Sequence, residues 1–261
     1  MSKKKQVNTA AAEHQLTTSA VGPKILFFGD PHGGFAPVFE GVQKLQPTAI
    51  VLLGDLQPQR PLHLELASIL SKTKCFLFRG NHDTDSDANY ENLFQSELAD
   101  RNLHGRVELI GGYSVACLGG VLRDKVWSPD MPSNRAVLDS AEKMASHARR
   151  GRHGSPGDVR TSWRGGILRK HHSSIFPNVY EQMRKMKADI LVSHEAPSAH
   201  SHGFAAIDKL AIGLGAKLVV HGHHHESIDY LAAGLIPSGL PFLAHGVDKG
   251  AFLALPPKES T

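Results

Sequence analysis

The chain has 261 residues, of which 41% are hydrophobic, and it carries a formal net charge of +4. This length is enough for one sizeable hydrophobic core. No apolar run approaches the roughly 20 residues that a membrane-spanning helix needs, so we expect no membrane segment. The mild positive charge is compatible with a phosphate-bearing substrate and does not by itself argue for nucleic acid.

The ends of the chain and its cysteines bear on the compartment. Lys3–Lys5 are not followed by an apolar stretch, so we expect no secretory signal. We expect residues 1–21, which are polar and small, to be a disordered tail before a single domain that spans residues 22–257. Cys75 and Cys117 each lie in an apolar run, which is typical of buried, reduced thiols. We therefore expect a cytoplasmic location.

Strands and helices alternate between Pro23 and Leu118, which predicts βαβ units and a mainly parallel sheet. The helices predicted in this part are Ala36–Leu45, Pro61–Ser71 and Ala88–Ala99. Val107–Ile110 and Tyr113–Leu118 then read as a short hairpin across Gly111–Gly112.

Residues 122–174 differ from the rest of the domain because they are rich in Gly, Pro, Ser and Arg. A long irregular segment inside a compact domain is usually functional or mobile. The middle of this segment is strongly basic and contains a single acidic residue, Asp158. Its basic residues are Arg149, Arg150, Arg152, Arg160, Arg164, Arg169 and Lys170. We predict an insertion that folds over the site, and the alternative is a solvated basic loop. For Trp127 and Trp163 we favour packing of the insertion over stacking on substrate.

Regular structure returns after the insertion. The pattern predicts helices at Phe176–Lys187 and Ala205–Gly213. It also predicts short antiparallel strands at Ser227–Leu231, Pro241–Ala244 and Ala251–Leu255.

Five short apolar runs end abruptly in residues that can bind metal. Runs of this length between turn signals read as buried strands, and sites in open parallel sheets gather beyond the carboxyl ends of the strands. The runs are Lys24–Gly29 before Asp30 and His32, Ala49–Gly54 before Asp55, Cys75–Gly80 before Asn81 and His82, Asp189–Ser193 before His194, and Lys217–Val220 before His221, His223 and His225. A shared polar site explains this repetition.

The residue types at these strand ends define the chemistry. Asp30 and His32 are separated by one residue, so both side chains can point the same way on an extended segment, and His223 and His225 repeat this spacing. Carboxylate, amide and imidazole together suit a metal such as Mn, Fe, Zn or Ni. The set contains no cysteine, which argues against a structural zinc site.

The number of candidate ligands predicts two metal ions, divalent or trivalent. The seven are Asp30, His32, Asp55, Asn81, His194, His223 and His225. They are too many for one tetrahedral site and suit two ions that share a carboxylate, about 3.5–4 Å apart, for displacement at phosphorus by metal-activated water. His82 is the natural donor of a proton to the leaving oxygen. We expect Asn81 and His82 to contact the substrate.

These motifs, taken in order, resemble those of the calcineurin-like metallophosphoesterase superfamily. The motifs are Gly29-Asp-Pro-His-Gly33, Gly54-Asp55, Gly80-Asn-His-Asp83, Ser193-His194 and Gly222-His-His-His225. The resemblance spans roughly Ile25 to Leu255. It implies an α/β (α+β) fold, a four-layer αββα sandwich of two mixed sheets flanked by helices, with a dinuclear centre at one edge.

The resemblance also implies how the ligands divide. Asp30, His32 and His225 would hold one ion. Asn81, His194 and His223 would hold the other. Asp55 would bridge the two ions, and His82 would face the phosphate.

The chain departs from the pattern of the protein-phosphatase members at one position. Those members carry a second Asp three residues after the bridging Asp, where it orients the catalytic histidine. Here that position is Pro58. Two alternatives follow: another carboxylate, with Asp83 as the candidate, orients His82, or this histidine is less well supported.

Other histidines have ordinary explanations. His221 lies on an apparently buried strand and reads as a core histidine, while His224 should point away from its two neighbours. His200 and His202 follow a ligand loop, and we expect both to be exposed to solvent.

The leading functional prediction is a metal-dependent hydrolase of phosphoric esters that favours phosphomonoesters. Its substrate would be a phosphorylated small molecule or a phosphoprotein. One alternative is a phosphodiesterase or nuclease, motivated by the basic insertion, although nucleic acid is not favoured. The other is a non-catalytic scaffold of the same fold, which is disfavoured because every expected ligand and His82 are present.

Overall fold

The computed structural model describes residues 14–15, 25–131, 137–150, 164–236, 239–256 and 258. Among these residues, no helix has the length and apolar character needed to cross a bilayer. Of the expected tail, residues 1–21, the structure describes only β1 (His14–Gln15), which pairs with β11.

The described strands form two sheets. The first has the order β1-β11-β2-β3-β4, with β2 (Ile25–Phe28), β3 (Ala49–Leu52) and β4 (Lys74–Leu77) parallel and β11 (Phe252–Leu255) antiparallel to β2. The second has the order β5-β6-β7-β8-β10-β9. Its strands are β5 (Val107–Ile110), β6 (Tyr113–Leu118), β7 (Ile190–Ser193), β8 (Leu218–His221), β9 (Ile228–Asp229) and β10 (Leu243–Gly246).

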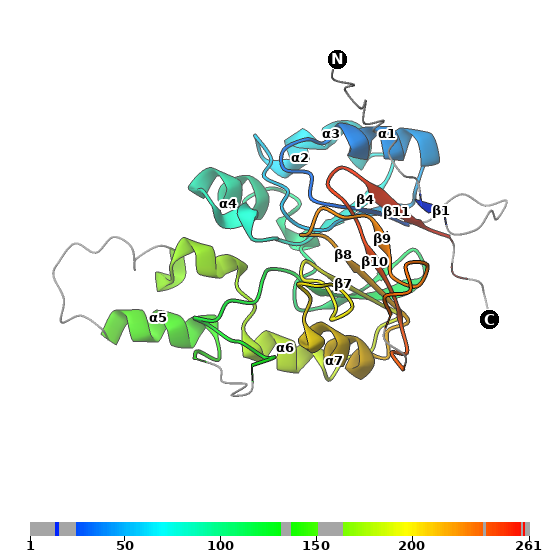
Figure 1. Ribbon diagram of the computed structural model, residues 1–261. Helices are drawn as coiled ribbons and strands as arrows, with labels where there is room; N and C mark the ends of the chain where they lie inside the picture. Colours follow the sequence, from blue (N-terminus) through cyan, green and yellow to red (C-terminus); the bar gives the residue numbers. More distant parts are fainter. Residues whose placement is uncertain are drawn as a thin grey trace, which may run out of the picture.

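The helices cover the outer faces of the two sheets, so that the molecule has four layers (Figure 1). α1 (Ala36–Leu45), α2 (Leu62–Glu65) and α3 (Ala67–Leu70) cover the first sheet, and α6 (Pro177–Met183) and α7 (Ala205–Leu214) cover the second. α4 (Asp87–Phe94) follows β4 at the side where α5 (Ala141–Arg150) projects. The predicted αββα sandwich of two mixed sheets is confirmed.

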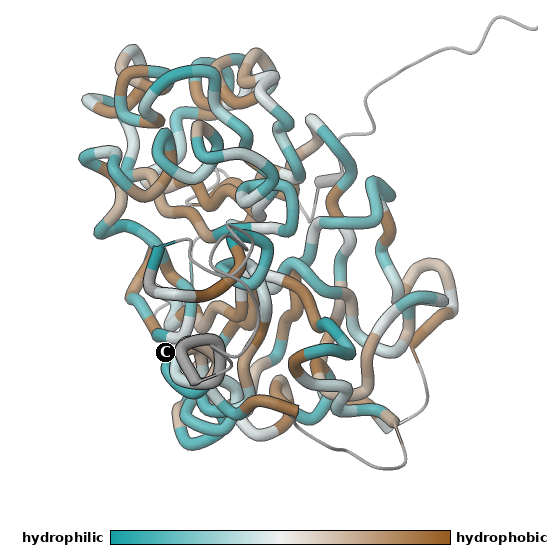
Figure 2. The backbone as a smooth tube through the Cα atoms, turned by 90° about the vertical axis from the view of Figure 1, so that its left-hand side faces the viewer, coloured by the Kyte–Doolittle hydropathy of each residue, from teal (hydrophilic) through white to brown (hydrophobic). Residues whose placement is uncertain are grey.

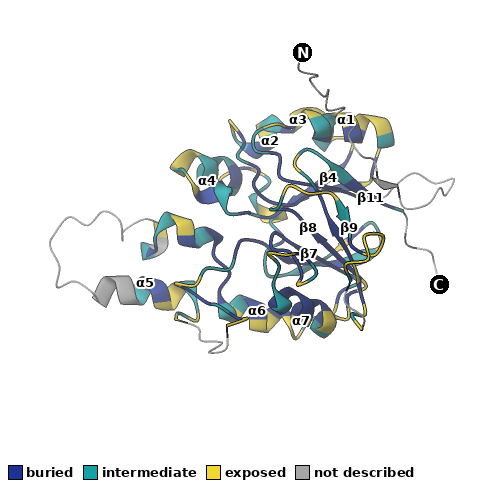
Figure 3. Cartoon of the chain, viewed as in Figure 1, coloured by how far each residue is buried: buried dark blue, intermediate teal, exposed yellow. Residues whose placement is uncertain are grey.

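The strands explain this layering because alternate residues face opposite sides of a sheet. In β2, Ile25 and Phe27 join the cluster between the sheets, while Leu26 and Phe28 join the cluster under α1. Hydrophobic stretches accordingly run through the middle of the molecule in Figure 2, and the strands are the most buried elements in Figure 3. A strand that is buried on both faces has an unbroken run of apolar residues in the sequence.

The helices lie where they were predicted, but their lengths differ from the predicted ones in part. α1 has the predicted bounds, whereas the helix expected at Pro61–Ser71 is divided into α2 and α3 at Leu66, whose ψ of 8° is not helical. The helix expected at Ala88–Ala99 is α4, which begins after Ser86 because this side chain accepts the N–H of Asn89.

Two further predictions need correction. The C-terminal strands are not all antiparallel, because β10 pairs in parallel with β8. The insertion at residues 122–174 is not wholly irregular, because it contains α5 and two short 3-10 turns, Arg164–Gly166 and Arg169–Ser173. Ser140 accepts the N–H of Lys143 and so caps α5.

Candidate metal centre

The predicted ligands lie in the turns that follow five strands. Asp30, Asp55 and Asn81 follow the parallel strands β2, β3 and β4 of the first sheet. His194 and His223 follow the parallel strands β7 and β8 of the second sheet. Since the carboxyl ends of parallel strands meet at one edge, the face-to-face sheets bring all of these side chains together.

One group of potential ligands is partly open to solvent. Asp30, His32 and His225 each offer one atom, and these atoms lie within 4.8 Å of one another. His32 Nε2 lies 3.0 Å from His225 Nε2. His32 Nδ1 donates to Gln57 Oε1 at 2.6 Å, which leaves Nε2 with a lone pair directed at the group. An amide that fixes the tautomer of a ligand histidine in this way is a common feature of metal sites.

A second group is more deeply buried. Asp55, His194 and His223 also offer atoms within 4.8 Å of one another. His194 is fully buried, and its Nδ1 donates to the carbonyl oxygen of Leu53 at 2.9 Å. Its Nε2 then faces Asn81 Oδ1 at 3.1 Å and Asp55 Oδ2 at 3.4 Å. A nitrogen that faces two oxygen acceptors needs positive charge, either as a proton on Nε2 or as a metal cation between the three atoms.

Asp55 lies between the two groups. Its Oδ2 is 3.4 Å from His194 Nε2 and 3.9 Å from His32 Nε2. Its Oδ1 accepts the backbone N–H of His82 at 2.8 Å. One carboxylate thus touches both candidate sites and the segment that carries His82.

The charges and hydrogen bonds of the centre favour the binding of cations. Asp30 is buried, and its Oδ2 accepts the N–H of His223 at 2.9 Å, but its Oδ1 has no hydrogen-bond partner among the described residues. Burial raises the pKa of Asp30 to about 7. Burial opposes a charge on His194, but the carboxylate of Asp55 prevails and raises the pKa of His194 to about 10. The orphaned oxygen and the inward-facing imidazoles fit a pair of divalent cations.

The backbone is strained where the ligands are held. Among the described residues, seven that are not glycine have a positive φ, and one of these, Gln46, merely ends α1. The other six lie at the centre: Asp30, His32, Asp55, Gln57, His223 and His225. Such strain persists when the surroundings determine it and it clusters at functional sites.

Two glycines allow the loops to approach one another. A Cβ atom on Gly80 would lie 2.2 Å from Asp55 Oδ1, and one on Gly222 would lie 2.6 Å from Asp30 Oδ2. Both distances are too short for any side chain, so glycine is required for these carboxylates to reach their positions.

His82 is paired with a carboxylate that the sequence analysis did not single out. His82 Nδ1 lies 2.5 Å from Asp85 Oδ2, and the His82 side chain is 46% exposed. Its ring centroid lies 5.5 Å from that of His32. Asp85 therefore orients His82 and leaves Nε2 at the open side of the centre. The i, i+3 spacing within one turn was the signal that could have identified Asp85.

Asp83 has a different role from the one expected. Its Oδ1 accepts the backbone N–H groups of Leu56 and Gln57 at 2.8 and 3.0 Å, and its Oδ2 accepts that of Gly80 at 2.8 Å. Asp83 is fully buried, and these three bonds direct its carboxylate into the loops rather than toward the His82 ring. It ties the loop after β3 to the loop after β4 and so fixes the separation of Asp55 and Asn81.

An arginine of the insertion contacts the loop of His82. Arg169 donates from Nε to the carbonyl oxygen of Thr84 at 3.0 Å and from Nη2 to that of Asp85 at 2.6 Å, and it pairs with the carboxylate of Asp87. Arg164 pairs with Glu91 on α4. The side chains of Arg149 and Arg150, and all of Arg152, Asp158, Arg160 and Trp163, lie outside the described residues.

Other singled-out side chains serve the core. Trp127 is buried and its ring packs on Tyr180 at 4.9 Å, so it anchors the insertion. His221 is also buried, with Nδ1 bonded to Gly222 O and Nε2 to Tyr230 OH, both at 2.8 Å. His200, expected to be exposed, is only 7% exposed because its ring stacks on His224.

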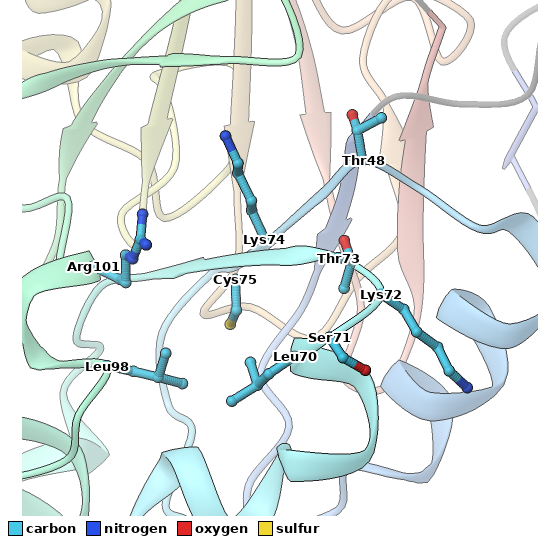
Figure 4. Close-up of a pocket in the computed structure, with 9 residues that line it drawn as sticks. All are labelled: Thr48, Leu70, Ser71, Lys72, Thr73, Lys74, Cys75, Leu98 and Arg101. Carbon is cyan, nitrogen blue, oxygen red and sulfur yellow. The ribbon is translucent and has the colours of Figure 1, made fainter.

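The pocket drawn in Figure 4 lies away from this centre. Its volume is about 430 Å³, and Thr48 and Lys74 line it beside Arg101. Thr48 and Lys74 mark the amino ends of β3 and β4, whereas the candidate metal ligands follow the carboxyl ends. This pocket is therefore not part of the candidate metal centre.

Comparison with known proteins settles the family. The model of the family described as calcineurin-like phosphoesterase matches residues 23–227. The chain belongs to the calcineurin-like phosphoesterase family. An uncharacterized protein of Haemophilus influenzae is 37% identical over 206 residues, which cover 79% of this chain and 85% of that protein.

Two solved structures show more distant likenesses. One crystal structure is 12% identical, with a TM-score of 0.46 over 87% of this chain and 91% of that one. A 5'-nucleotidase precursor from Thermus thermophilus is 17% identical, with a TM-score of 0.35 over 86% of this chain and 48% of that one. The family assignment rests on the family model and the Haemophilus relative.

Membership of this family indicates the general chemistry for which the Asp and His clusters are arranged. This family of phosphoesterases acts on phosphoric esters with the help of metal ions, and the centre contains Asp and His clusters that can hold such ions.

Proposed function

We propose that the chain is a metal-dependent phosphoric ester hydrolase with a dinuclear centre and a preference for phosphomonoesters. The observation that carries the proposal is the position of Asp55, whose carboxylate lies between the two ligand groups and also accepts the N–H of His82. Asp30, His32 and His225 would hold one ion, and Asn81, His194 and His223 the other. When bound, such ions lower the pKa of water and offset the charge of phosphoryl oxygens.

His82 is the proton donor in this proposal. Asp85 holds its Nδ1 at 2.5 Å, so Nε2 is the nitrogen that can give a proton to the leaving oxygen. The partial exposure of His82 allows leaving groups of different size to lie beside it.

The proposed preference for monoesters rests on how many groups can contact the nonbridging oxygens of the phosphate. A monoester presents three nonbridging oxygens, whereas a diester presents two. Besides the two ions, the amide nitrogen of Asn81 can donate to these oxygens, because Asn81 Oδ1 is directed at His194. A small phosphorylated molecule or a phosphorylated side chain would satisfy this arrangement.

The described arginines of the insertion do not favour a nucleic acid substrate. Arg164 and Arg169 are paired with Glu91 and Asp87, and so their charges are offset within the protein. Backbone binding of DNA or RNA needs cations that are free to neutralise phosphates.

The experiment is hydrolysis of para-nitrophenyl phosphate and of bis(para-nitrophenyl) phosphate by the full chain. Each ester is tested after chelation of metals and again after addition of Mn²⁺. We expect Mn²⁺ to restore hydrolysis of both esters and to give the higher kcat/KM with the monoester.

The outcomes separate the parts of the proposal. Hydrolysis that is unaffected by chelation would contradict the metal centre, and no hydrolysis with any added metal would favour a scaffold. A higher kcat/KM with the diester would overturn the monoester preference and leave the metal-dependent chemistry intact.

A further inference from the structure

A buried carboxylate next to the centre has no role in the chemistry described above. Glu195 follows His194 directly and is 3% exposed. Its Oε1 accepts the backbone N–H of Leu122 at 2.7 Å. Among the described residues, no cationic group forms an ion pair with it. A buried carboxylate is costly unless it is paired with a cation.

A histidine that the dinuclear centre does not use lies beside this carboxylate. The ring of His224 is held by stacking on His200, with centroids 4.0 Å apart and planes inclined by 20°. His224 Nε2 is buried and has no hydrogen-bond partner among the described residues. An imidazole nitrogen that is both buried and unpartnered calls for an explanation.

We propose that Glu195, His223 and His224 form a third cation site, which adjoins the dinuclear centre and is suited to zinc. One carboxylate oxygen and one nitrogen from each imidazole lie within 4.8 Å of one another. A cation at this position offsets the buried charge of Glu195 and gives His224 a partner. Two imidazoles and one carboxylate are a donor set that zinc commonly takes, with a fourth position left for water.

The third site adjoins the dinuclear centre because the two share a residue. His223 also belongs to the group with Asp55 and His194. An ion at Glu195 and His224 shares this imidazole, whose two ring nitrogens can each bind one ion, and therefore we expect it to bind more weakly than the first two ions. The third site goes beyond the proposed function, since hydrolysis by two ions does not require it.

The test is the number of zinc ions that the full chain binds. Isothermal titration calorimetry and elemental analysis after zinc saturation give the stoichiometry for the native chain, Glu195→Gln and His224→Gln. The controls are Glu226→Gln and His202→Gln, which change a neighbouring exposed carboxylate and a neighbouring exposed histidine. Crystals of the native chain with zinc, measured at the zinc absorption edge, then locate each ion.

We expect three zinc ions in the native chain and in both controls, and two in Glu195→Gln and in His224→Gln. The third anomalous peak should lie about 2.0–2.2 Å from Glu195 and His224. Two ions in the native chain, or three retained in both variants, would overturn the third site and leave the proposed function standing. Fewer than two ions in the native chain would count against both. Two substitutions are used so that a folding defect in one does not decide the result.

Discussion

The two ligand groups of the centre differ in their exposure to solvent. In the group of Asp30, His32 and His225, the last residue is exposed and the second is partly exposed. In the group of Asp55, His194 and His223, the first two are buried and only His223 is partly exposed. The histidines also differ in how they are oriented, by a side-chain amide for His32 and by a main-chain carbonyl for His194.

In the proposed dinuclear centre, this difference predicts which ion would bind more firmly. The main-chain carbonyl of Leu53, a buried residue directly after β3, is fixed by the fold, whereas Gln57 can change its rotamer. Charges in the buried group are also screened less by solvent. We therefore expect the ion at Asp55, His194 and His223 to bind more tightly, and the ion at Asp30, His32 and His225 to exchange more readily.

The largest effect is expected for Asp55→Asn. Asp55 is the carboxylate that both groups share, so its loss should weaken both ions at once. We expect no measurable hydrolysis of an aryl phosphate and a loss of bound Mn²⁺ on elemental analysis. Asp100→Asn, which removes an exposed carboxylate elsewhere, is the control. Full retention of Mn²⁺ by Asp55→Asn would contradict a shared ligand.

His82→Ala should lower kcat without releasing metal. Loss of a general acid costs typically about 10²–10⁴-fold in rate. The loss should be larger for an alkyl phosphate than for para-nitrophenyl phosphate, because the nitrophenolate leaves without a proton. His202→Ala is the matched control. Equal losses with both esters would argue that His82 does not donate the proton.

Gln57→Ala tests the difference between the two groups directly. Gln57 orients His32 and makes no described contact with His194. Removal of a group that orients a ligand costs about 10–100-fold in metal affinity. We expect this loss for one Mn²⁺ and an unchanged affinity for the other in a calorimetric titration. The neighbouring Gln59→Ala is the control and should have no effect. Equal weakening of the binding of both ions by Gln57→Ala would contradict the expected difference between the two groups.

Arg169→Ala should have the smallest effect. Its guanidinium holds the carbonyls of Thr84 and Asp85 and so steadies the segment of His82. Partly exposed contacts of this kind contribute about 0–1 kcal/mol, so kcat should fall no more than roughly fivefold with metal content unchanged. Steady-state kinetics of Arg169→Ala, with Arg184→Ala as the control, measures this fall in kcat. A rise in KM without a change in kcat would indicate instead that Arg169 contacts the substrate.

Much of the site could be predicted because it depends on local sequence. Each ligand follows an apolar run, and the end of a buried strand is visible where hydrophobic residues give way to Gly and Asp. The parallel pairing of these strands brings the ligands to one edge, whereas their division into two groups came from the resemblance to the calcineurin-like superfamily. Gln57 was missed because its contact with His32 depends on left-handed backbone at both residues, with φ of 43° and 45°.

Other features depend on contacts that the sequence pattern does not contain. Asp85 rather than Asp83 orients His82 because the segment forms a 3-10 turn that directs Asp83 inward. β10 lies parallel to β8 through pairing across the sheet, and its short run gives no sign of direction. Arg169 reaches Thr84 from 85 residues away, which only the packing of the insertion reveals.

The most direct measurement is anomalous diffraction from crystals of the full chain soaked with Mn²⁺. The account predicts two strong peaks about 3.5–4 Å apart, with a carboxylate oxygen of Asp55 within bonding distance of both. A single peak, or two peaks of which neither contacts Asp55, would contradict it.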